Sequence, residues 1–211
     1  SYTLSGTDAN NYMAPGDTVV ADGVITQKQL TVTNFDLVST KEYDGLASST
    51  INNVACSGIV PTDDVQVSAT ATYTSPTAGT NKPITVMYAL SGADSANYRK
   101  PADSIATATG EIARKQLSVS GTTVANKDYD GTTLASLSSQ GMLGGVVVGN
   151  TVTFTAVGTY DTKHAGENKD VTVAYTLSGS DKDNYLAPAN AVLTGTIHKK
   201  LLTAKDIDVT D

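Results

Sequence analysis

The sequence predicts an all-β fold in which small antiparallel β-sandwich modules follow one another and form an elongated rod. Three observations predict it. The composition is dense in Thr, Ser, Val, Gly and Asn, which favours strands and turns over helices. Apolar and polar residues alternate along several stretches, and one set of motifs returns every 85 to 87 residues. At 211 residues, the chain has room for two domains of ordinary size.

Three motifs recur in a fixed order. The pattern Tyr-x-Leu-Ser-Gly-x-Asp-x-x-Asn-Tyr spans residues 2–12, 88–98 and 175–185. Lys-x-Tyr-Asp-Gly spans 41–45 and 127–131, and Gly-x-Ile-x-x-Lys-x-Leu spans 23–30, 110–117 and 195–202. A chain that repeats one module in this way usually specifies length or valency rather than a single active site.

The repeat spacing divides the chain into four parts. They are the C-terminal part of one repeat (1–29), two complete modules (30–116 and 117–204) and the start of a further repeat (205–211). We therefore expect the array to continue beyond this sequence. Tandem repeats look the same under circular permutation, so a module could instead begin near Tyr2. If modules begin near Lys28, residues 1–27 lack partners and should be frayed, or should pair with a neighbouring chain.

Alternating apolar and polar residues predict the central strands of each module. The alternation covers 65–73 and 84–90 in the first complete module, and 152–160 and 171–177 in the second. Turn-forming residues separate these stretches. Residues 112–119 read as a continuous strand that joins the modules without a hinge, which predicts a stiff rod of modules roughly 30–40 Å long. A β-grasp-like module with one short helix is the alternative fold.

Charge and composition exclude several classes of function. The net charge is −7 and the 14 Lys and Arg residues form no basic stripe, so we expect neither nucleic acid nor an anionic membrane as partner. There is no 18-residue apolar run, so we expect no membrane insertion. No Ser-His-Asp set, phosphate-binding loop or dinucleotide fingerprint is present, so we do not expect an enzyme. We expect a monomer.

The repeated aromatic motifs are interpreted as structural turns. We expect Asp-Gly to form a tight turn above a packed tyrosine ring whose hydroxyl bonds to a turn. A cation bound by the aspartate is the alternative. We also expect the last tyrosine of the longer motif to plug one end of the sandwich, after a turn capped by the motif's aspartate. The residues concerned are Tyr43, Asp44, Gly45, Tyr129, Asp130, Gly131, Tyr98 and Tyr185.

The longer motif also supplies weak candidates for calcium ligands. Calcium takes six to eight oxygen ligands, and a strong site places several acids at alternate positions. The motif offers only one or two acids per loop, so calcium is the single cofactor that we consider, and no other is expected. The candidates are Asp94, Asn97, Asp181, Asp183 and Asn184.

Repeated lysines permit one further hypothesis, an internal Lys–Asn cross-link. Lys41 and Lys127 would pair with Asn97 and Asn184, and Lys28, Lys115 and Lys200 are repeated as well. Amphipathic lysines at strand edges explain the same pattern without a covalent bond.

At these motifs the chain resembles the YDG repeat over essentially its whole length. Such repeats occur in tandem in large bacterial haemagglutinin-like surface adhesins, with related MBG and bacterial immunoglobulin-like modules. The resemblance implies immunoglobulin-like sandwiches that serve as a stalk or spacer, extracellular on the bacterial surface or secreted, in cell adhesion and biofilm growth. Neighbouring repeats of the same chain would be the direct partners, and another domain at the tip would bind a host glycan or protein.

The alternative function is a weak, multivalent glycan- or protein-binding module. In that case each repeat should expose the same aromatic anchor. Tyr12, Tyr98 and Tyr185 are the residues that would serve.

Overall fold

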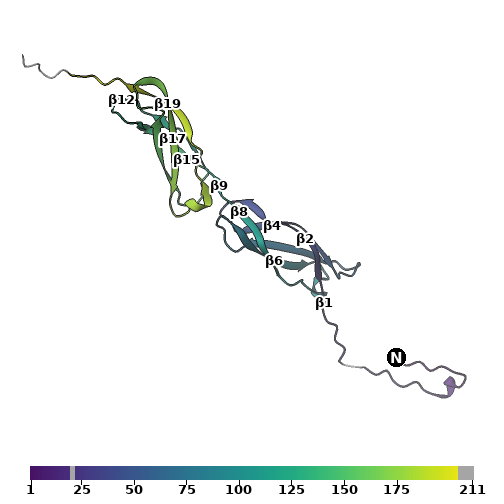
Figure 1. The fold of residues 1–211 in the computed structure, drawn as a ribbon. Coiled ribbons are helices and arrows are strands. Elements are labelled where there is room, and N and C mark those ends of the chain that lie inside the picture. The colour runs from purple at the N-terminus through teal and green to yellow at the C-terminus, as the bar shows by residue number, and fades with distance from the viewer. Residues whose placement is uncertain (20–21, 204–211) are drawn as a thin grey trace, which may run out of the picture.

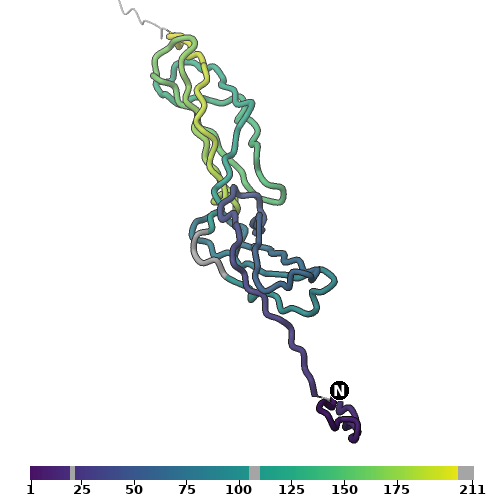
Figure 2. The backbone as a smooth tube through the Cα atoms, turned by 90° about the vertical axis from the view of Figure 1, so that its right-hand side faces the viewer, coloured from purple at the N-terminus to yellow at the C-terminus, as the bar shows by residue number. Residues whose placement is uncertain are grey.

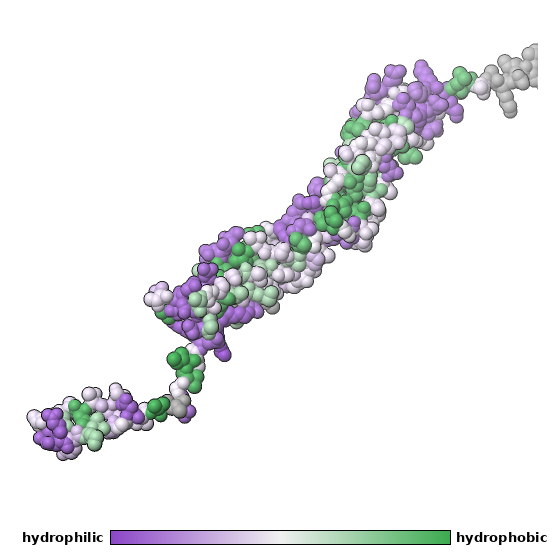
Figure 3. All heavy atoms as spheres, turned by 180° about the vertical axis from the view of Figure 1, so that it is seen from behind, coloured by the Kyte–Doolittle hydropathy of each residue, from purple (hydrophilic) through white to green (hydrophobic). Residues whose placement is uncertain are grey.

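The computed structural model describes residues 1–19 and 22–203, with the backbone alone at 105–109, and it confirms the all-β prediction. Two modules lie end to end and form one elongated body, and the N-terminal segment extends from one end of it (Figures 1 and 2). The space-filling view shows the same body, with the N-terminal segment standing apart (Figure 3). We call residues 28–113 module 1 and residues 115–198 module 2.

Module 1 contains strands β1 to β8. Their bounds are β1 (Lys28–Gln29), β2 (Thr31–Val38), β3 (Thr40–Glu42), β4 (Ser48–Ser57), β5 (Gln66–Tyr73), β6 (Gly79–Ser91), β7 (Tyr98–Arg99) and β8 (Ser104–Ala113). Six of them form a sheet in the order β2-β4-β5-β6-β8-β3, and β1 pairs with β7. Because β2 and β3 follow one another in the chain but lie at opposite edges, the sheet curls around a single core.

Module 2 repeats this arrangement in shorter pieces. Its strands are β9 (Lys115–Gln116), β10 (Ser118–Ser120), β11 (Thr123–Val124), β12 (Lys127–Asp128), β13 (Leu134–Ala135), β14 (Leu137–Ser139), β15 (Met142–Gly144), β16 (Thr153–Tyr160), β17 (Gly166–Ser178), β18 (Tyr185–Leu186) and β19 (Ala191–His198). Five form a sheet in the order β12-β19-β17-β16-β13. The pairs β10–β15, β11–β14 and β9–β18 complete the module.

The predicted central strands are confirmed in both modules. β5 pairs antiparallel with β6 from Gln66 opposite Ser91 to Tyr73 opposite Ile84. β16 and β17 pair in the same way from Thr153 opposite Ser178. Buried and exposed side chains alternate along β5 and β16 because one face of each strand covers the core.

The antiparallel prediction is incomplete, since the pairs that close each module are parallel. β3 pairs parallel with β8 and β12 with β19, while β1 pairs parallel with β7 and β9 with β18. The cause lies in the direction of the chain. We call the end at which the chain enters a module its upstream end, and the end at which the chain leaves it its downstream end. The first and last strands of a module both run from the upstream to the downstream end.

The helical segments of the described residues are three-residue 3₁₀ turns. They are η1 (Ala9–Asn11), η2 (Ser95–Asn97) and η3 (Lys182–Asn184). The β-grasp-like alternative, which requires a longer helix, is therefore wrong. Within residues 1–19 and 22–203, no helix is long and apolar enough to cross a membrane.

Each module has a core built around tyrosine. In module 1, Tyr73 lies among the buried side chains of Ile84, Val86 and Ile112. In module 2, Tyr160 takes the same place, and a Cβ atom at Gly195 would lie 2.7 Å from its hydroxyl oxygen. The glycine of the Gly-x-Ile motif is thus required by the ring that packs against it.

The N-terminal segment shows where a module begins. Gly23-Val24-Ile25 repeats the sequence pattern of β8, yet Ile25 is fully exposed, whereas the matching Ile112 is buried. No strand occurs in the described residues before Lys28. Residues 28–29 and 115–116, which the repeat spacing placed at the end of the preceding parts, pair inside the module that follows them. The predicted continuous strand over 112–119 is interrupted at Arg114 and Leu117.

Candidate functional site: the junction between the modules

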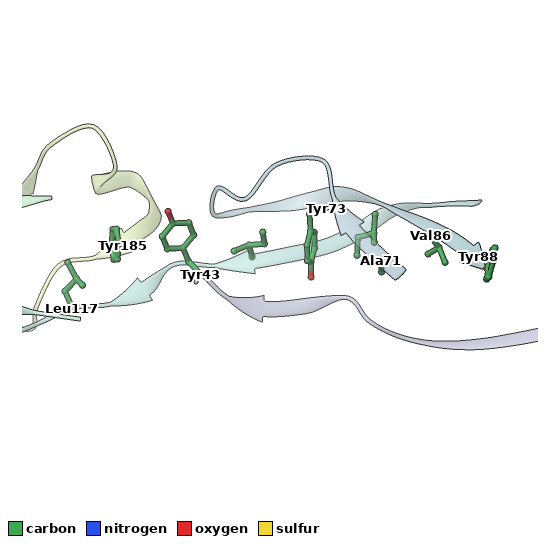
Figure 4. Close-up of a cluster of buried hydrophobic side chains, with 9 residues drawn as sticks. Tyr43, Ala71, Tyr73, Val86, Tyr88, Leu117 and Tyr185 are labelled. Atoms are coloured by element: carbon green, nitrogen blue, oxygen red, sulfur yellow. The ribbon is translucent and has the colours of Figure 1, made fainter. Parts of the chain in front are cut away.

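The candidate site lies where the Tyr-Asp-Gly turn of module 1 meets two loops of module 2. This turn follows β3, the edge strand that ends at the downstream end of module 1. The two loops are residues 145–152, before β16, and the η3 turn, before β18. The side chains of Tyr43, Leu117 and Tyr185 join one cluster of buried residues, so the core of module 1 continues into module 2 (Figure 4).

Two tyrosines and one asparagine form the centre of the junction. The rings of Tyr43 and Tyr185 meet edge to face, with centroids 5.4 Å apart and planes at 80°. Both hydroxyl groups donate to Oδ1 of Asn150, at 2.8 Å from Tyr43 and 2.5 Å from Tyr185. The Val147 amide donates to the Tyr185 hydroxyl oxygen at 3.0 Å, which orients this hydroxyl toward Asn150. Tyr43 is 4% exposed and Tyr185 is 3% exposed.

The junction keeps the Tyr43 phenol neutral. Burial raises the pKa of the Tyr43 hydroxyl, the hydrogen bond to Asn150 opposes this shift, and the nearby Tyr185, Asp181 and Asp44 raise the pKa further. The hydroxyl therefore keeps its proton at physiological pH and acts as a hydrogen-bond donor.

Three contacts surround this centre. The amide of Ala78 in module 1 donates to Oδ1 of Asn184 at 2.8 Å. Lys115 at the start of module 2 forms a salt bridge with Glu42, with Nζ and Oε1 3.0 Å apart. Gly45 lies so close to module 2 that a Cβ atom there would be 3.1 Å from Cγ1 of Val147. Backbone, charged and apolar contacts thus all cross the junction.

The aspartate of the Tyr-Asp-Gly turn acts within its own module. Lys41 Nζ donates to Oδ1 of Asp44 at 2.7 Å, and the Leu46 amide donates to the same oxygen at 2.9 Å. In module 2, Asp130 Oδ1 accepts from Lys127 Nζ at 2.9 Å, and from the Thr132 amide and hydroxyl. In both modules the chain bends at the glycine, and the aspartate accepts from the amide two residues further on. The Tyr43 hydroxyl, however, bonds to a loop of the next module.

We expect acid to weaken the Asp130 turn only below about pH 4. Donation from Lys127, followed by donation from the amide and hydroxyl of Thr132, lowers the pKa of Asp130 from 3.8 to about 2. Since the folded-state pKa lies below the ordinary value, the ionised carboxylate stabilises module 2 above pH 4. This contribution disappears as the pH falls from about 4 to about 2. NMR titration of the Asp130 carboxyl carbon should give a midpoint near 2.

The Lys127→Met variant supplies the control for this titration, because it removes the largest cause of the shift. Its midpoint for Asp130 should move back toward 3.8. A midpoint near 3.8 in the unchanged chain would contradict the hydrogen-bonded turn.

The longer motif's aspartates do not cap their own turns, so that prediction is wrong. Neither Asp94 nor Asp181 forms a side-chain capping bond with the 3₁₀ turn that follows it. Instead, Oδ2 of Asp94 accepts from the Asp64 amide at 2.9 Å, and Oδ2 of Asp181 accepts from the Thr151 amide at 2.8 Å. Each aspartate thus ties its turn to the loop that precedes β5 or β16.

The calcium candidates do not converge. Asp183 pairs with Lys182 at 2.7 Å, Asn184 accepts from Ala78, and Asp94 and Asp181 bond to backbone amides. Asn97 is exposed on module 1. In the part of the chain that the structure describes, no three His, Cys, Asp or Glu side chains lie close enough together to hold a metal ion.

Two lysines of the cross-link hypothesis, Lys41 and Lys127, lie at the other end of their own module from its asparagine. Lys28 and Lys115, by contrast, lie opposite Tyr98 and Tyr185, beside Asn97 and Asn184. Lys41 and Lys127 belong to the Tyr-Asp-Gly turns at the downstream ends of the modules, where their amines contact Asp44 and Asp130. Asn97 and Asn184 belong to η2 and η3 at the upstream ends. A cross-link within one module from Lys41 to Asn97, or from Lys127 to Asn184, therefore has no support in the geometry, and the Lys115 amine pairs with Glu42.

The downstream end of module 2 has no described module against it, so its Tyr-Asp-Gly turn can be compared with the turn that the junction covers in module 1. Tyr129 donates its amide to the carbonyl of His198 at 2.9 Å, as Tyr43 does to Ala113 at 2.8 Å. Tyr129 is nevertheless only half-buried, whereas Tyr43 is buried. The two turns differ in that Tyr43 has a following module against its ring.

Sequence reasoning identified both tyrosines of the junction but missed Asn150, Ala78 and Glu42. One signal was available for Asn150. The matching position in module 1 is Asp63, so both modules place a hydrogen-bond acceptor in the loop before their long central hairpin.

Comparison with known proteins agrees with the repeat pattern. The YDG domain matches the chain twice, at residues 26–106 and 113–192. Both matches begin two residues before the strand segments β1 and β9, which pair inside the following module. No curated protein and no solved structure matches the chain. Since the two matches cover well over half of its length, the chain belongs to the YDG domain family.

Proposed function

We propose that this chain is a stalk segment of a large bacterial surface adhesin, which holds a tip binding domain away from the cell envelope. The segment would be extracellular, on the cell surface or secreted. Its role would be mechanical, without catalysis. The observation that supports this most is the continuous core through the junction, where Tyr43 of one module packs against Tyr185 of the next.

The strand arrangement suits a segment under tension. β8 is the last strand of module 1 and leads through Arg114 into β9 of module 2, so the chain passes between the modules without a separate linker. β3 pairs with β8 in parallel, from Thr40 opposite Glu111 to Glu42 opposite Ala113. A pull along the rod would load these backbone hydrogen bonds together, which resist more than bonds that open one at a time.

The alternative function, a weak glycan- or protein-binding module, loses its aromatic anchors. Tyr98 is 4% exposed and Tyr185 is 3% exposed, so neither ring can stack on a ligand. Tyr12 is exposed, but it lies in the N-terminal segment outside both modules. No aromatic side chain of the longer motif is therefore presented in the same way by each module.

A replacement experiment separates the two functions. In the parent adhesin, residues 28–203 are exchanged for an unrelated rigid pair of β-sandwich domains of the same length, and cell adhesion is measured. A spacer predicts that adhesion is retained, and that deletion without replacement reduces it. Loss of adhesion after the length-matched exchange would contradict the spacer and support binding by the modules themselves.

A further inference from the structure

The upstream end of module 1 is built like the upstream end of module 2. In module 1, the Tyr98 hydroxyl donates to Oδ2 of Asp63 at 2.6 Å and accepts from the Val60 amide at 3.0 Å. In module 2, the Tyr185 hydroxyl donates to Asn150 and accepts from the Val147 amide, also at 3.0 Å. Asp63 therefore stands where module 2 has the asparagine that receives Tyr43.

The surrounding backbone holds both ends in the same shape. The Asp94 and Asp181 carboxylates fix the two loops through the Asp64 and Thr151 amides. Leu30 and Leu117 donate their amides to the carbonyls of Arg99 and Leu186, each at 3.1 Å. Module 1 reaches this geometry without a module packed on its upstream end. A partner that docks there would meet a preformed surface and would not have to order it.

The two ends differ in what is covered. Asn184 is 7% exposed because module 1 lies over it, whereas the matching Asn97 is exposed. Val147 is half-buried against Gly45, whereas the matching Val60 is 38% exposed. The five groups of module 2 that form the ring contact, the hydrogen bonds, the salt bridge and the Gly45 contact at the junction have counterparts at the upstream end of module 1. These counterparts are Lys28, Val60, Asp63, Asn97 and Tyr98.

We propose that these five residues form an acceptor for the Tyr-Asp-Gly end of a further YDG module. The hydroxyl of the incoming tyrosine donates to the Asp63 carboxylate, which Tyr98, itself only 4% exposed, holds in place from within module 1. The acidic residue that precedes this tyrosine, glutamate at position 42 and aspartate at position 128, pairs with Lys28. The proposal rests on the stalk function and the junction contacts described above but goes beyond them, because it names the partner of a second surface.

Asp63 makes this acceptor selective for a hydroxyl donor. An ionised carboxylate only accepts hydrogen bonds, whereas an asparagine amide can also donate. Two phenol hydroxyls that donate to one carboxylate form charge-assisted bonds, which are stronger than those to a neutral amide. A partner with phenylalanine at this position would leave the carboxylate with one donor fewer. The acceptor therefore favours the tyrosine of Lys-x-Tyr-Asp-Gly.

A three-module chain tests the proposal. A second copy of residues 28–112 is joined to Thr26 in place of residues 1–25, because Ile112 and Ile25 occupy matching positions in the repeat. Two readouts are followed by NMR, hydrogen exchange at the copied Ala78 amide and residual dipolar couplings of all three modules. We expect the copied amide to exchange at least about tenfold more slowly than in the Asn97→Ala variant, and the upstream module to hold one fixed orientation.

Matched variants separate the two junctions. In the original module 1, Asn97→Ala should speed exchange at the copied Ala78 alone. In module 2, Asn184→Ala should speed exchange at the original Ala78 alone. Asp63→Ala should release the upstream module, whereas Asp63→Asn should keep it docked. Rapid exchange at the copied amide, with an averaged upstream orientation beside an ordered original junction, would overturn the acceptor. Averaging at both junctions would overturn the rigid stalk as well.

Discussion

Replacing Tyr43 by alanine should uncouple the two modules while leaving both folded. The change removes the ring that packs against Tyr185 and the hydroxyl that donates to Asn150, and it opens a gap at the centre of the junction. Buried tyrosines at the centre of an interface cost about 2 kcal/mol or more when truncated. We expect the relative orientation of the modules, measured by residual dipolar couplings, to average over many states. Small-angle scattering should show a wider range of end-to-end distances.

Two variants control this experiment. Tyr43→Phe keeps the ring and removes one hydrogen bond, so it should weaken the junction by only about 1 kcal/mol. Tyr129→Ala makes the same change in module 2, at the end that no described module covers, and should leave the orientation unchanged. A Tyr43→Ala chain whose modules stay aligned would show that the salt bridge between Lys115 and Glu42 and the bond from Ala78 suffice.

The central strands of each module could be predicted because the residues that become buried are apolar and occupy alternate positions in the sequence. In β5, for example, Val67, Ala69 and Ala71 face the core and the intervening Ser and Thr residues face water. A polar residue at any of the inner positions would bury a group without a partner, so the pattern is strongly constrained. The parallel closing pairs could not be predicted in this way, because at least one strand of each pair has only two or three residues, too few to show a period.

The junction could not be predicted from the repeats, and the reason is general. A residue that is copied in every module can contact its own module or the next one, and the two cases give the same spacing. Tyr43 and Asn150 are 107 residues apart, more than one period, whereas Tyr185 and the same Asn150 are 35 apart. The Tyr-Asp-Gly motif predicts a tight turn beside Tyr43, and the structure shows a bend at Gly45. Only the structure shows that the Tyr43 hydroxyl crosses to the following module.

Replacing Tyr160 by alanine should unfold module 2 at a temperature at which module 1 stays folded. The ring is 2% exposed, packs over Gly195 and lies 5.6 Å below the amine of Lys127. Truncation of a buried aromatic side chain costs about 3–5 kcal/mol, and a small domain has only about 5–15 kcal/mol of stability. For a domain of this size, the melting temperature should fall by roughly 12 °C or more. Calorimetry should then resolve two transitions.

Tyr73→Ala provides the matched test, because Tyr73 occupies the same place in module 1 and its hydroxyl donates to the Ser39 carbonyl at 2.8 Å. It should lower the transition of module 1 and leave that of module 2 almost unchanged. The junction contributes a few side chains, whereas each core contributes a complete cluster, so the modules should melt separately. A single shared transition in both variants would mean that the junction couples the cores more strongly than these contacts allow. The rod would then unfold as one cooperative unit under load.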